Sequence, residues 1–332
     1  MSTEASLDLQ FIYQPIQKEM RALSQFLKDE FHSREPFLWE ILQHIARFRG
    51  KQIRPALLFL VSKAGASEAG EDHIKIAAVI ELIHTATLVH DDVLDDALLR
   101  RDVETVHRRW GERAAVLIGD YIYSRAFHLS TEIPGMAGLL SDTTHAICEG
   151  ELLQIATRFQ EIDEATYFQI IRKKTAILYG VSCQIGGMLG GLDADRCAKF
   201  HDFGMELGTA FQIVDDCLDY KGSESVAGKS LGTDLHQGKV TLPLIYLMES
   251  MSEAERKWLR EALARPLSLE AEARIRQLVE ERGVVPDACA RAEAFIQSAK
   301  TILVEVSSCD PRLSAVRDSL DLVADYIVRR SR

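Results

Sequence analysis

The chain has 332 residues, of which 47% are hydrophobic and 27% charged, as is usual for a globular protein. Its net charge of −11 argues against general nucleic-acid binding, which needs a basic surface, but does not exclude phosphate ligands held by local basic clusters. No apolar run of about eighteen residues occurs, so we expect no membrane span. The chain lacks a secretory leader pattern and its six cysteines show no CxxC spacing, so we expect a cytoplasmic protein without a zinc site.

Apolar residues recur at helical spacing along most of the chain. Alternation with a period of two is absent over any convincing length, and no Asn-Gly or Asp-Gly pair indicates a hairpin. No linker divides the chain. We therefore predict an all-α protein, a single domain over residues 1–332 that forms one large helical bundle around a central cavity. The predicted helices include residues 7–31 with a break at Pro15, 36–48, 56–63, a long helix from about Glu71, 253–265 and 269–282.

The stretch from Glu81 to Trp110 contains the sequence DDVLD, with aspartates at 91, 92 and 95. It has no proline or glycine, so we predict a helix on which Asp91 and Asp95 share one face, a turn apart. Acids so close repel each other, and Mg²⁺ relieves this because it prefers one or two carboxylates together with phosphate oxygens. Arg100 and Arg101 follow, and arginine suits bidentate phosphate binding. A diphosphate site is one interpretation, and a solvated, salt-bridged helix face is the other.

A second acidic cluster, DDCLD, repeats the same spacing with aspartates at 215, 216 and 219. It also lies in an apolar helical stretch, and Gln212, Asp215 and Asp219 fall at i, i+3 and i+7, so they share one stripe. Two acidic clusters on buried helices are hard to explain as surface. We therefore predict that both clusters meet on one substrate, on facing helices of the bundle.

With these motifs the chain resembles the trans (all-E) polyprenyl diphosphate synthases, the family that elongates isoprenoid chains. The resemblance also rests on GKQIRP from Gly50 to Pro55, on Lys174-Thr175, and on GKSLGTDLHQGKVTLP from Gly228 to Pro243, all in family order. It implies the isoprenoid synthase type I fold and the condensation of an allylic diphosphate with successive isopentenyl diphosphates. One departure is Asp102, which stands where the family usually has glycine after its arginine pair.

The resemblance implies roles for individual residues. About three Mg²⁺ ions per active site would bind the allylic diphosphate through Asp91, Asp95 and Asp215. With Lys174 and Lys229 these aspartates form the implied catalytic set. The allylic diphosphate would contact Arg100, Lys174, Thr175, Gln212, Lys229 and Lys239, and the isopentenyl diphosphate would contact Lys51, Arg54, His84 and Arg101. The remaining aspartates of the motifs, Asp92, Asp216 and Asp219, would act through water or through the ligating residues.

Some of these residues have plainer interpretations. His84 lies on an apolar stripe with Leu88, where a histidine is often a satisfied core residue. Thr175 could bond back to its own helix, and Gln212 could merely fill space. The two functional alternatives outside chain elongation are a class I terpene cyclase and a non-catalytic subunit of a heteromeric synthase. A cyclase would not need a second DDxxD cluster, and a non-catalytic subunit should show decayed acids or lysines.

Product length should depend on the helix below the first motif. Ala86 and Thr87 lie about one turn before Asp91 and are small, and Ile83 lies a further turn below. Short-chain members of the family commonly place aromatic residues there or carry an insertion in the motif, and this chain has neither. A helical turn rises about 5.4 Å, comparable with one isoprene unit, so we predict a product of about C30 to C50, as in quinone side chains. A short-chain farnesyl or geranylgeranyl diphosphate synthase is the alternative.

The family resemblance also implies a homodimer.

Overall fold

The computed structural model of the chain describes residues 9–48, 50–65, 69–220, 232–264, 267–307 and 311–329. Within these ranges nearly all regular structure is helical, which confirms the predicted all-α class. The one sheet in the described part of the chain is a hairpin of two short strands. Lys229 and the motif residues around it lie outside the described residues.

The chain divides into two compact units, which we describe separately. Unit 1 comprises Met1–Thr144, Leu178–Gly204 and Ile302–Val323, and unit 2 comprises His145–Ile177, Met205–Thr301 and Ala324–Arg332. Several of the divisions fall inside helices: α8 (Met136–Ala156), α11 (Ala194–Leu218), α17 (Val284–Ser307) and α18 (Pro311–Arg329). The predicted single domain over residues 1–332 stays a prediction.

In unit 1 the helix boundaries follow the positions of prolines and of acidic residues in the first turns. Pro15 lies in a short 3₁₀ turn, η2, and Pro36 opens a helix, as the sequence predicts. Glu71 and Asp72 occupy the first turn of the long helix α5, where acids stabilise the positive end of the helix dipole. The elements are α1 (Leu9–Ile12), η2 (Gln14–Ile16), α2 (Gln17–Glu30), α3 (Pro36–Ile45), α4 (Ile53–Ser62), α5 (Glu71–Leu94), β1 (Leu99–Arg100), β2 (Val103–Glu104), α6 (Val106–Trp110) and α7 (Glu112–Thr131), with parts of α8, α10 (Ile177–Leu189), α11, α17 and α18.

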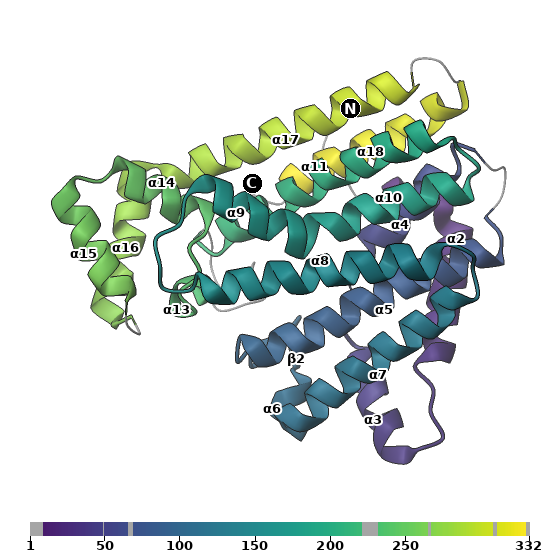
Figure 1. Ribbon diagram of the computed structural model, residues 1–332, viewed down its shortest axis with the longest axis horizontal. Coiled ribbons are helices and arrows are strands. Elements are labelled where there is room, and N and C mark those ends of the chain that lie inside the picture. The colour runs from purple at the N-terminus through teal and green to yellow at the C-terminus, as the bar shows by residue number, and fades with distance from the viewer. Residues whose placement is uncertain are drawn as a thin grey trace. The chain divides into compact units, whose positions relative to one another are not determined.

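The core of unit 1 forms around α4 and α5. Helix α4 is buried on nearly every side, and α5 packs against α2, α4 and α7, with α7 running alongside it in Figure 1. A helix that is apolar all round is typical of a buried position. Helix α10 comes close to α4 at Gly186, where an added Cβ would lie 2.5 Å from the Leu58 carbonyl oxygen. The main chains of these two helices therefore approach each other at a glycine.

We expect Gly186→Ala to destabilise unit 1 by about 2–3 kcal/mol, because the methyl group forces α10 away from the α4 main chain. Gly138 is the matched control, since it lies on a helix in the same unit with no atom within 4 Å of an added Cβ. Gly138→Ala should be neutral or stabilising by up to about 1 kcal/mol. Urea unfolding of both variants measures the difference, and equal midpoints would contradict the close approach.

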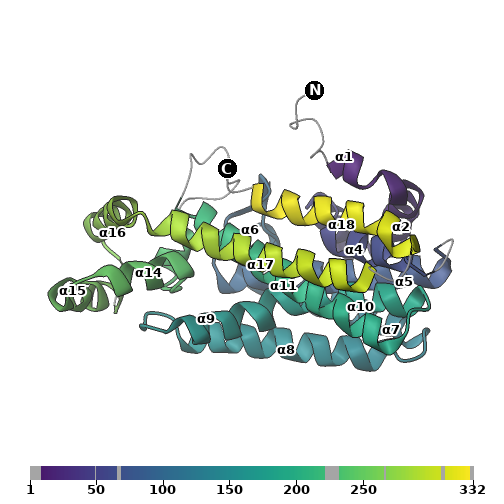
Figure 2. The same ribbon diagram turned by 90° about the horizontal axis from the view of Figure 1, so that it is seen from above.

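Unit 2 contains the second aspartate motif and the helices that follow it. Ser252 and Ser268 cap α15 and α16 by accepting hydrogen bonds from main-chain N–H groups, and Gly283 ends α16 with a positive φ. Figure 2 shows α14, α15 and α16 gathered together, and α14 contacts α16. The elements are α9 (Glu164–Ile171), η3 (Arg172–Ala176), α13 (Thr233–His236), α14 (Leu242–Ser250), α15 (Glu253–Leu263) and α16 (Leu269–Arg282), with parts of α8, α10, α11, α17 and α18.

None of the helices in the described part of the chain is both long and apolar enough to cross a bilayer.

Candidate functional site

The first aspartate motif lies at the C-terminal end of α5. Asp91 is in the last turn and Asp95 is the C-cap residue, whose N–H donates to the Asp91 carbonyl oxygen at 2.8 Å. Both side chains are half-buried. The C-terminal end of a helix carries a partial negative charge, which adds to the charge of the two carboxylates. The end of α5 is therefore a place where a cation binds favourably.

Asp92 differs from its neighbours because its side chain is 1% exposed. Its Oδ1 accepts a hydrogen bond from Arg100 Nε at 2.7 Å and lies 2.6 Å from Arg100 Nη2. Burial raises the pKa of this carboxyl group, and the hydrogen bond from Arg100 opposes that rise. Asp92 thus fixes the Arg100 guanidinium beside the motif, in keeping with the prediction that it acts through another residue.

Arg100 and Arg101 lie on a β-hairpin, so the predicted helix through Glu81–Trp110 is wrong between Asp95 and the start of α6 at Val106. Strands β1 and β2 pair antiparallel, with Arg101 and Asp102 as the two-residue turn between them. Both turn residues have a positive φ, +52° for Arg101 and +64° for Asp102. A hairpin with two positive φ values is of the I′ kind, which favours Asn-Gly, and Arg-Asp gives no such signal in a sequence.

The turn explains what the family's glycine after the arginine pair does, since glycine adopts a positive φ without strain. We expect Asp102→Gly to raise the free energy of unfolding by about 0.5–1 kcal/mol, and Asp102→Ala to lower it because alanine tolerates this conformation worse than aspartate. Thermal unfolding measures both. Equal midpoints for the glycine and alanine variants would show that backbone strain at residue 102 is negligible.

A basic cluster in unit 1 contains three of the four residues predicted to bind isopentenyl diphosphate. Arg101 Nη1 donates to the Phe48 carbonyl oxygen at 2.6 Å. The guanidinium groups of Arg54 and Arg101 both act on His84, and burial together with these charges lowers the pKa of His84 well below its usual value. His84 is therefore a neutral imidazole at pH 7, placed among arginines and not in a purely apolar core. Lys51, the fourth predicted residue, is exposed just before α4, on the connector that Tyr13 Oη holds by donating to the Lys51 carbonyl oxygen at 2.8 Å.

Glu81 belongs to this cluster, although the sequence analysis did not single it out. Burial raises the pKa of its carboxyl group, while the guanidinium groups of Arg54 and Arg101 oppose the rise. A carboxylate beside two guanidinium groups restricts their orientation through charge. The sequence does contain one indication of this role: Glu81 lies three residues before His84, on the same face of the helix.

The Lys174-Thr175 pair lies in η3, a π-helical turn of unit 2. Such wide turns occur mostly inside α-helices and frequently at functional sites. Lys174 Nζ donates to Gln154 Oε1 at 2.8 Å and forms an ion pair with Glu151. Gly150 of α8 lets the turn come close, because an added Cβ there would lie 2.6 Å from the Lys174 main-chain nitrogen.

A hydrogen-bonded chain connects Thr175 to the second aspartate motif. Thr175 Oγ1 donates to Gln212 Oε1 at 2.8 Å, and Gln212 Nε2 donates to Asp216 Oδ1 at 2.7 Å. Tyr167 Oη donates to the other Asp216 oxygen at 2.7 Å. Thr175 therefore does not bond back to its own helix, and Gln212 does more than fill space. Tyr167 was missed because its partner is 49 residues away in the sequence.

The three aspartates of the second motif have separate surroundings. Burial raises the pKa of Asp216 well above its usual value, and the charge of Asp234 adds to that rise. Asp219 accepts hydrogen bonds from the main-chain N–H groups of Gly232, Thr233 and Asp234 at 3.1–3.3 Å, so it fixes the start of α13. Asp215 is half-buried on α11. Asp216 and Asp219 therefore hold neighbouring elements of unit 2 in place, in keeping with the prediction that they act through other residues.

Lys239 follows α13 and is almost fully buried, with its Nζ 3.7 Å from Asp234 Oδ1. A buried ammonium group needs an anionic partner, and Asp234 supplies one in unit 2. The other predicted lysine of this motif, Lys229, lies outside the described residues, so its contact with a diphosphate stays a prediction.

The motif carboxylates fit a magnesium ion that is shared with a substrate. Among the described residues, no group of three or more His, Cys, Asp or Glu side chains is arranged to hold a metal alone. Mg²⁺ does not need such a group, because it is usually held by one or two carboxylates with water and phosphate oxygens. Asp91 and Asp95, a turn apart at the negative end of α5, supply that number of carboxylates.

The residues predicted to control product length lie on α5 below Asp91. Ile83 and Ala86 are fully buried, while Thr87 is half-buried and donates from Oγ1 to the His84 carbonyl oxygen at 2.7 Å. Their positions agree with a wall inside the protein. That they line a tunnel for the product stays a prediction.

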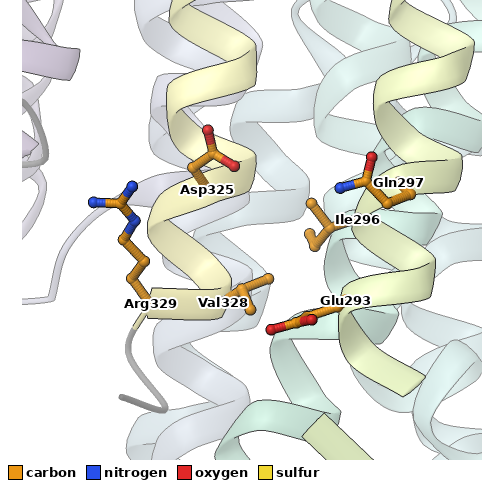
Figure 3. A pocket seen from close by; sticks show the side chains of 6 residues that line it. All are labelled: Glu293, Ile296, Gln297, Asp325, Val328 and Arg329. Atoms are coloured by element: carbon orange, nitrogen blue, oxygen red, sulfur yellow. The ribbon is translucent and has the colours of Figure 1, made fainter. Parts of the chain in front are cut away.

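A groove of about 230 Å³ lies in unit 2 (Figure 3). Three of its residues come from α17 and three from α18, and they carry charges of both signs. Its lining contains none of the predicted site residues: it consists of Glu293, Ile296, Gln297, Asp325, Val328 and Arg329. The groove therefore gives no support to a second catalytic site.

Comparison with known proteins connects this geometry to one family. The family model described as polyprenyl synthetase matches residues 35–282. An octaprenyl diphosphate synthase from Escherichia coli is 36% identical over 260 residues, which are 77% of this chain and 80% of that protein. The crystal structure of a decaprenyl diphosphate synthase from Rhodobacter capsulatus matches 98% of this chain and 100% of its own with a TM-score of 0.89 and 32% identity. A polyprenyl synthase from Caulobacter crescentus, complexed with calcium and isoprenyl diphosphate, covers 98% of both chains with a TM-score of 0.90 and 31% identity.

Proposed function

The chain belongs to the polyprenyl synthetase family, and from this premise we propose that it is a trans-prenyltransferase that makes a medium- or long-chain polyprenyl diphosphate. It adds successive isopentenyl units to an allylic diphosphate and stops at about C30 to C50, a length suited to a quinone side chain. Two observations support the proposal. The carboxylates of Asp91 and Asp95 lie at the end of α5, beside Arg100, which Asp92 holds in place. A separate pair of arginines, Arg54 and Arg101, lies around His84.

The aspartate motifs are proposed to hold the leaving diphosphate. Asp91, Asp95 and Asp215 would hold about three Mg²⁺ ions, and bound Mg²⁺ supplies charge neutralisation that makes diphosphate a better leaving group. Arg100, Lys174 and Lys239, with Lys229, would bind the same diphosphate by charge-assisted hydrogen bonds. Thr175 and Gln212 are kept in place by the hydrogen bonds that end at Asp216.

The arginine cluster of unit 1 is proposed to bind isopentenyl diphosphate without metal. Arg54 and Arg101 supply guanidinium donors, and the exposed Lys51 adds charge at the start of α4. His84 is neutral, so it donates one hydrogen bond without adding positive charge. Holding the two substrates at fixed sites converts their reaction into one within a single complex, which is a large part of catalysis for such a condensation.

Incubating the purified chain with farnesyl diphosphate, labelled isopentenyl diphosphate and Mg²⁺ tests the proposal. We expect label to enter products longer than farnesyl, and chelation with EDTA to abolish incorporation. A terpene cyclase would instead release hydrocarbons from farnesyl diphosphate alone, and a non-catalytic subunit would consume neither substrate. Either of these results would remove the proposed function.

We also propose that the enzyme works in the cytoplasm as a homodimer. Helix α7 of unit 1 exposes Leu117 at 68% with Val116 and Tyr121 nearby, and helix α8 exposes Leu152 at 65% with Ile155 in unit 2. Large apolar side chains gathered on a helix face support a protein interface. A second copy of the chain is the proposed partner for each of these faces.

We expect Leu117→Asp, and separately Leu152→Asp, to convert the dimer into monomers, because a charge on a buried interface costs more than the interface contributes there. Leu269→Asp is the control, since Leu269 is 83% exposed in the first turn of α16. Sedimentation equilibrium gives the mass of each variant. A wild-type protein that sediments as a monomer, or variants that stay dimeric, would contradict this assignment of the faces.

A further inference from the structure

The guanidinium group of Arg54 is held against an aromatic ring. Arg54 lies in the first turn of α4, and its Cζ lies 4.4 Å from the centre of the Tyr179 ring, which belongs to α10 in the same unit. Tyr179 is among the largest fully buried side chains of the described protein. The face of an aromatic ring attracts a guanidinium group within about 6 Å, and the attraction is stronger where water is excluded.

Tyr179 is tightly packed, with its side chain fully buried and its main chain close to α11. Gly204 of α11 packs against it so closely that an added Cβ would lie 2.4 Å from the Tyr179 carbonyl oxygen. Full burial of the Tyr179 side chain limits the movement of the ring that Arg54 contacts. The position of the guanidinium group therefore depends on α10, an element other than the helix that carries Arg54.

The Tyr179 ring covers one side of the guanidinium group and leaves the other side for another partner. Nε of Arg54 is buried and has no hydrogen-bond acceptor among the described residues. Buried donors are almost always paired, and one without an acceptor is costly. Nε itself is out of reach of a ligand, so a diphosphate would bind the guanidinium group through its other donors, on the side away from the ring.

The charges around Arg54 support an anion on this side. Glu81 is close enough to Arg54 and Arg101 for both guanidinium groups to favour its carboxylate form, and His84 nearby carries no charge. One carboxylate against two guanidinium groups leaves the cluster net positive. A diphosphate group supplies the compensating charge.

We propose that Tyr179 is a positioning residue for the isopentenyl diphosphate site: its ring holds the Arg54 guanidinium in place so that the donors away from the ring face the diphosphate. This inference rests on the proposed function, because Arg54 must bind that diphosphate. Tyr179 itself does not contact the substrate. The part of its side chain that acts is the ring face, not the hydroxyl group.

Calorimetric titration with isopentenyl diphosphate tests the proposal, in the presence of Mg²⁺ and farnesyl thiodiphosphate, whose bridging sulfur resists ionisation. We expect Tyr179→Phe to bind within twofold of the wild type, and Tyr179→Leu to bind about tenfold more weakly because the ring face is lost. Phe200→Leu is the matched control: it removes another fully buried ring from unit 1 and should leave binding within twofold. In steady-state kinetics, Tyr179→Leu should raise KM for isopentenyl diphosphate and leave kcat and KM for the allylic substrate unchanged.

The outcomes distinguish the proposed function from the positioning role of Tyr179. A wild-type chain that does not bind isopentenyl diphosphate overturns the proposed function and this inference together. Wild-type binding with an unchanged Tyr179→Leu variant overturns the inference alone, as does a Tyr179→Phe or Phe200→Leu variant that loses as much affinity as Tyr179→Leu. Fluorinated phenylalanines at position 179 keep the ring volume nearly constant and test the proposal even where the leucine variant does not fold: affinity should fall with each added fluorine, and a constant affinity would overturn it.

Discussion

Replacing Asp91 by asparagine is expected to lower kcat for chain elongation about a thousandfold, the largest effect of any single change to the first motif. Asparagine keeps the shape of the side chain but removes its charge. Asp91 and Asp95 lie at the negative end of α5, a turn apart, and are proposed to hold, as carboxylates, a cation shared with the diphosphate. Steady-state assays at several Mg²⁺ concentrations should show a higher half-saturating concentration as well as a lower kcat.

Asp96 provides the matched control for this change. It is the next acid after Asp95, its side chain is 95% exposed, and its Oδ1 lies 3.6 Å from His107 Nε2. Asp96→Asn removes the same charge from the same end of α5 and should leave kcat within twofold. An Asp91→Asn variant that keeps more than a tenth of wild-type activity, or an equal loss of activity in Asp96→Asn, would contradict a specific role of Asp91 in binding the cation.

Replacing Ala86 by phenylalanine is expected to shorten the product by several isoprene units, to about C15–C20. Ala86 is fully buried on α5, a little more than one turn before Asp91, so a ring there would fill space in the protein interior where the growing chain is predicted to run. Thr87→Tyr, on the half-buried side of the helix, should shorten the product as well. Mass spectrometry of the dephosphorylated products gives their lengths directly.

Ala86→Ser is the control, because it nearly preserves the volume of the side chain and should leave the product unchanged. A buried phenylalanine can also strain its surroundings, so the thermal midpoint of each variant should be measured beside its product. A folded Ala86→Phe variant that makes the wild-type product would mean that the chain passes elsewhere. Shortening in Ala86→Phe alone would assign the wall to the buried side of α5.

The features that local spacing determines were predictable from the sequence. The pairing of Asp91 with Asp95 follows from helical periodicity, and the start of α5 at Glu71 follows from an acidic first turn. The predicted helices over 253–265 and 269–282 correspond to α15, which ends at Leu263, and to α16, which ends at Arg282. These predictions succeed because neighbours in the sequence are also neighbours on a helix.

The features that the sequence analysis missed depend on residues far apart in the chain or on an unusual backbone conformation. The hairpin after α5 turns at Arg101 and Asp102, two residues that seldom take a positive φ. Tyr167 reaches Asp216 across 49 residues, and the Tyr179 ring that covers Arg54 belongs to a different helix. Composition and periodicity carry no information about such partners.

The product of the wild-type chain gives the sharpest test of the proposed function. Farnesyl diphosphate, an excess of isopentenyl diphosphate and Mg²⁺ are incubated with the enzyme, and the dephosphorylated products are analysed by mass spectrometry. We expect all-trans alcohols whose final chain length lies between about C30 and C50. Unchanged farnesol, a cyclic hydrocarbon, or a product that stops at C20 would contradict it.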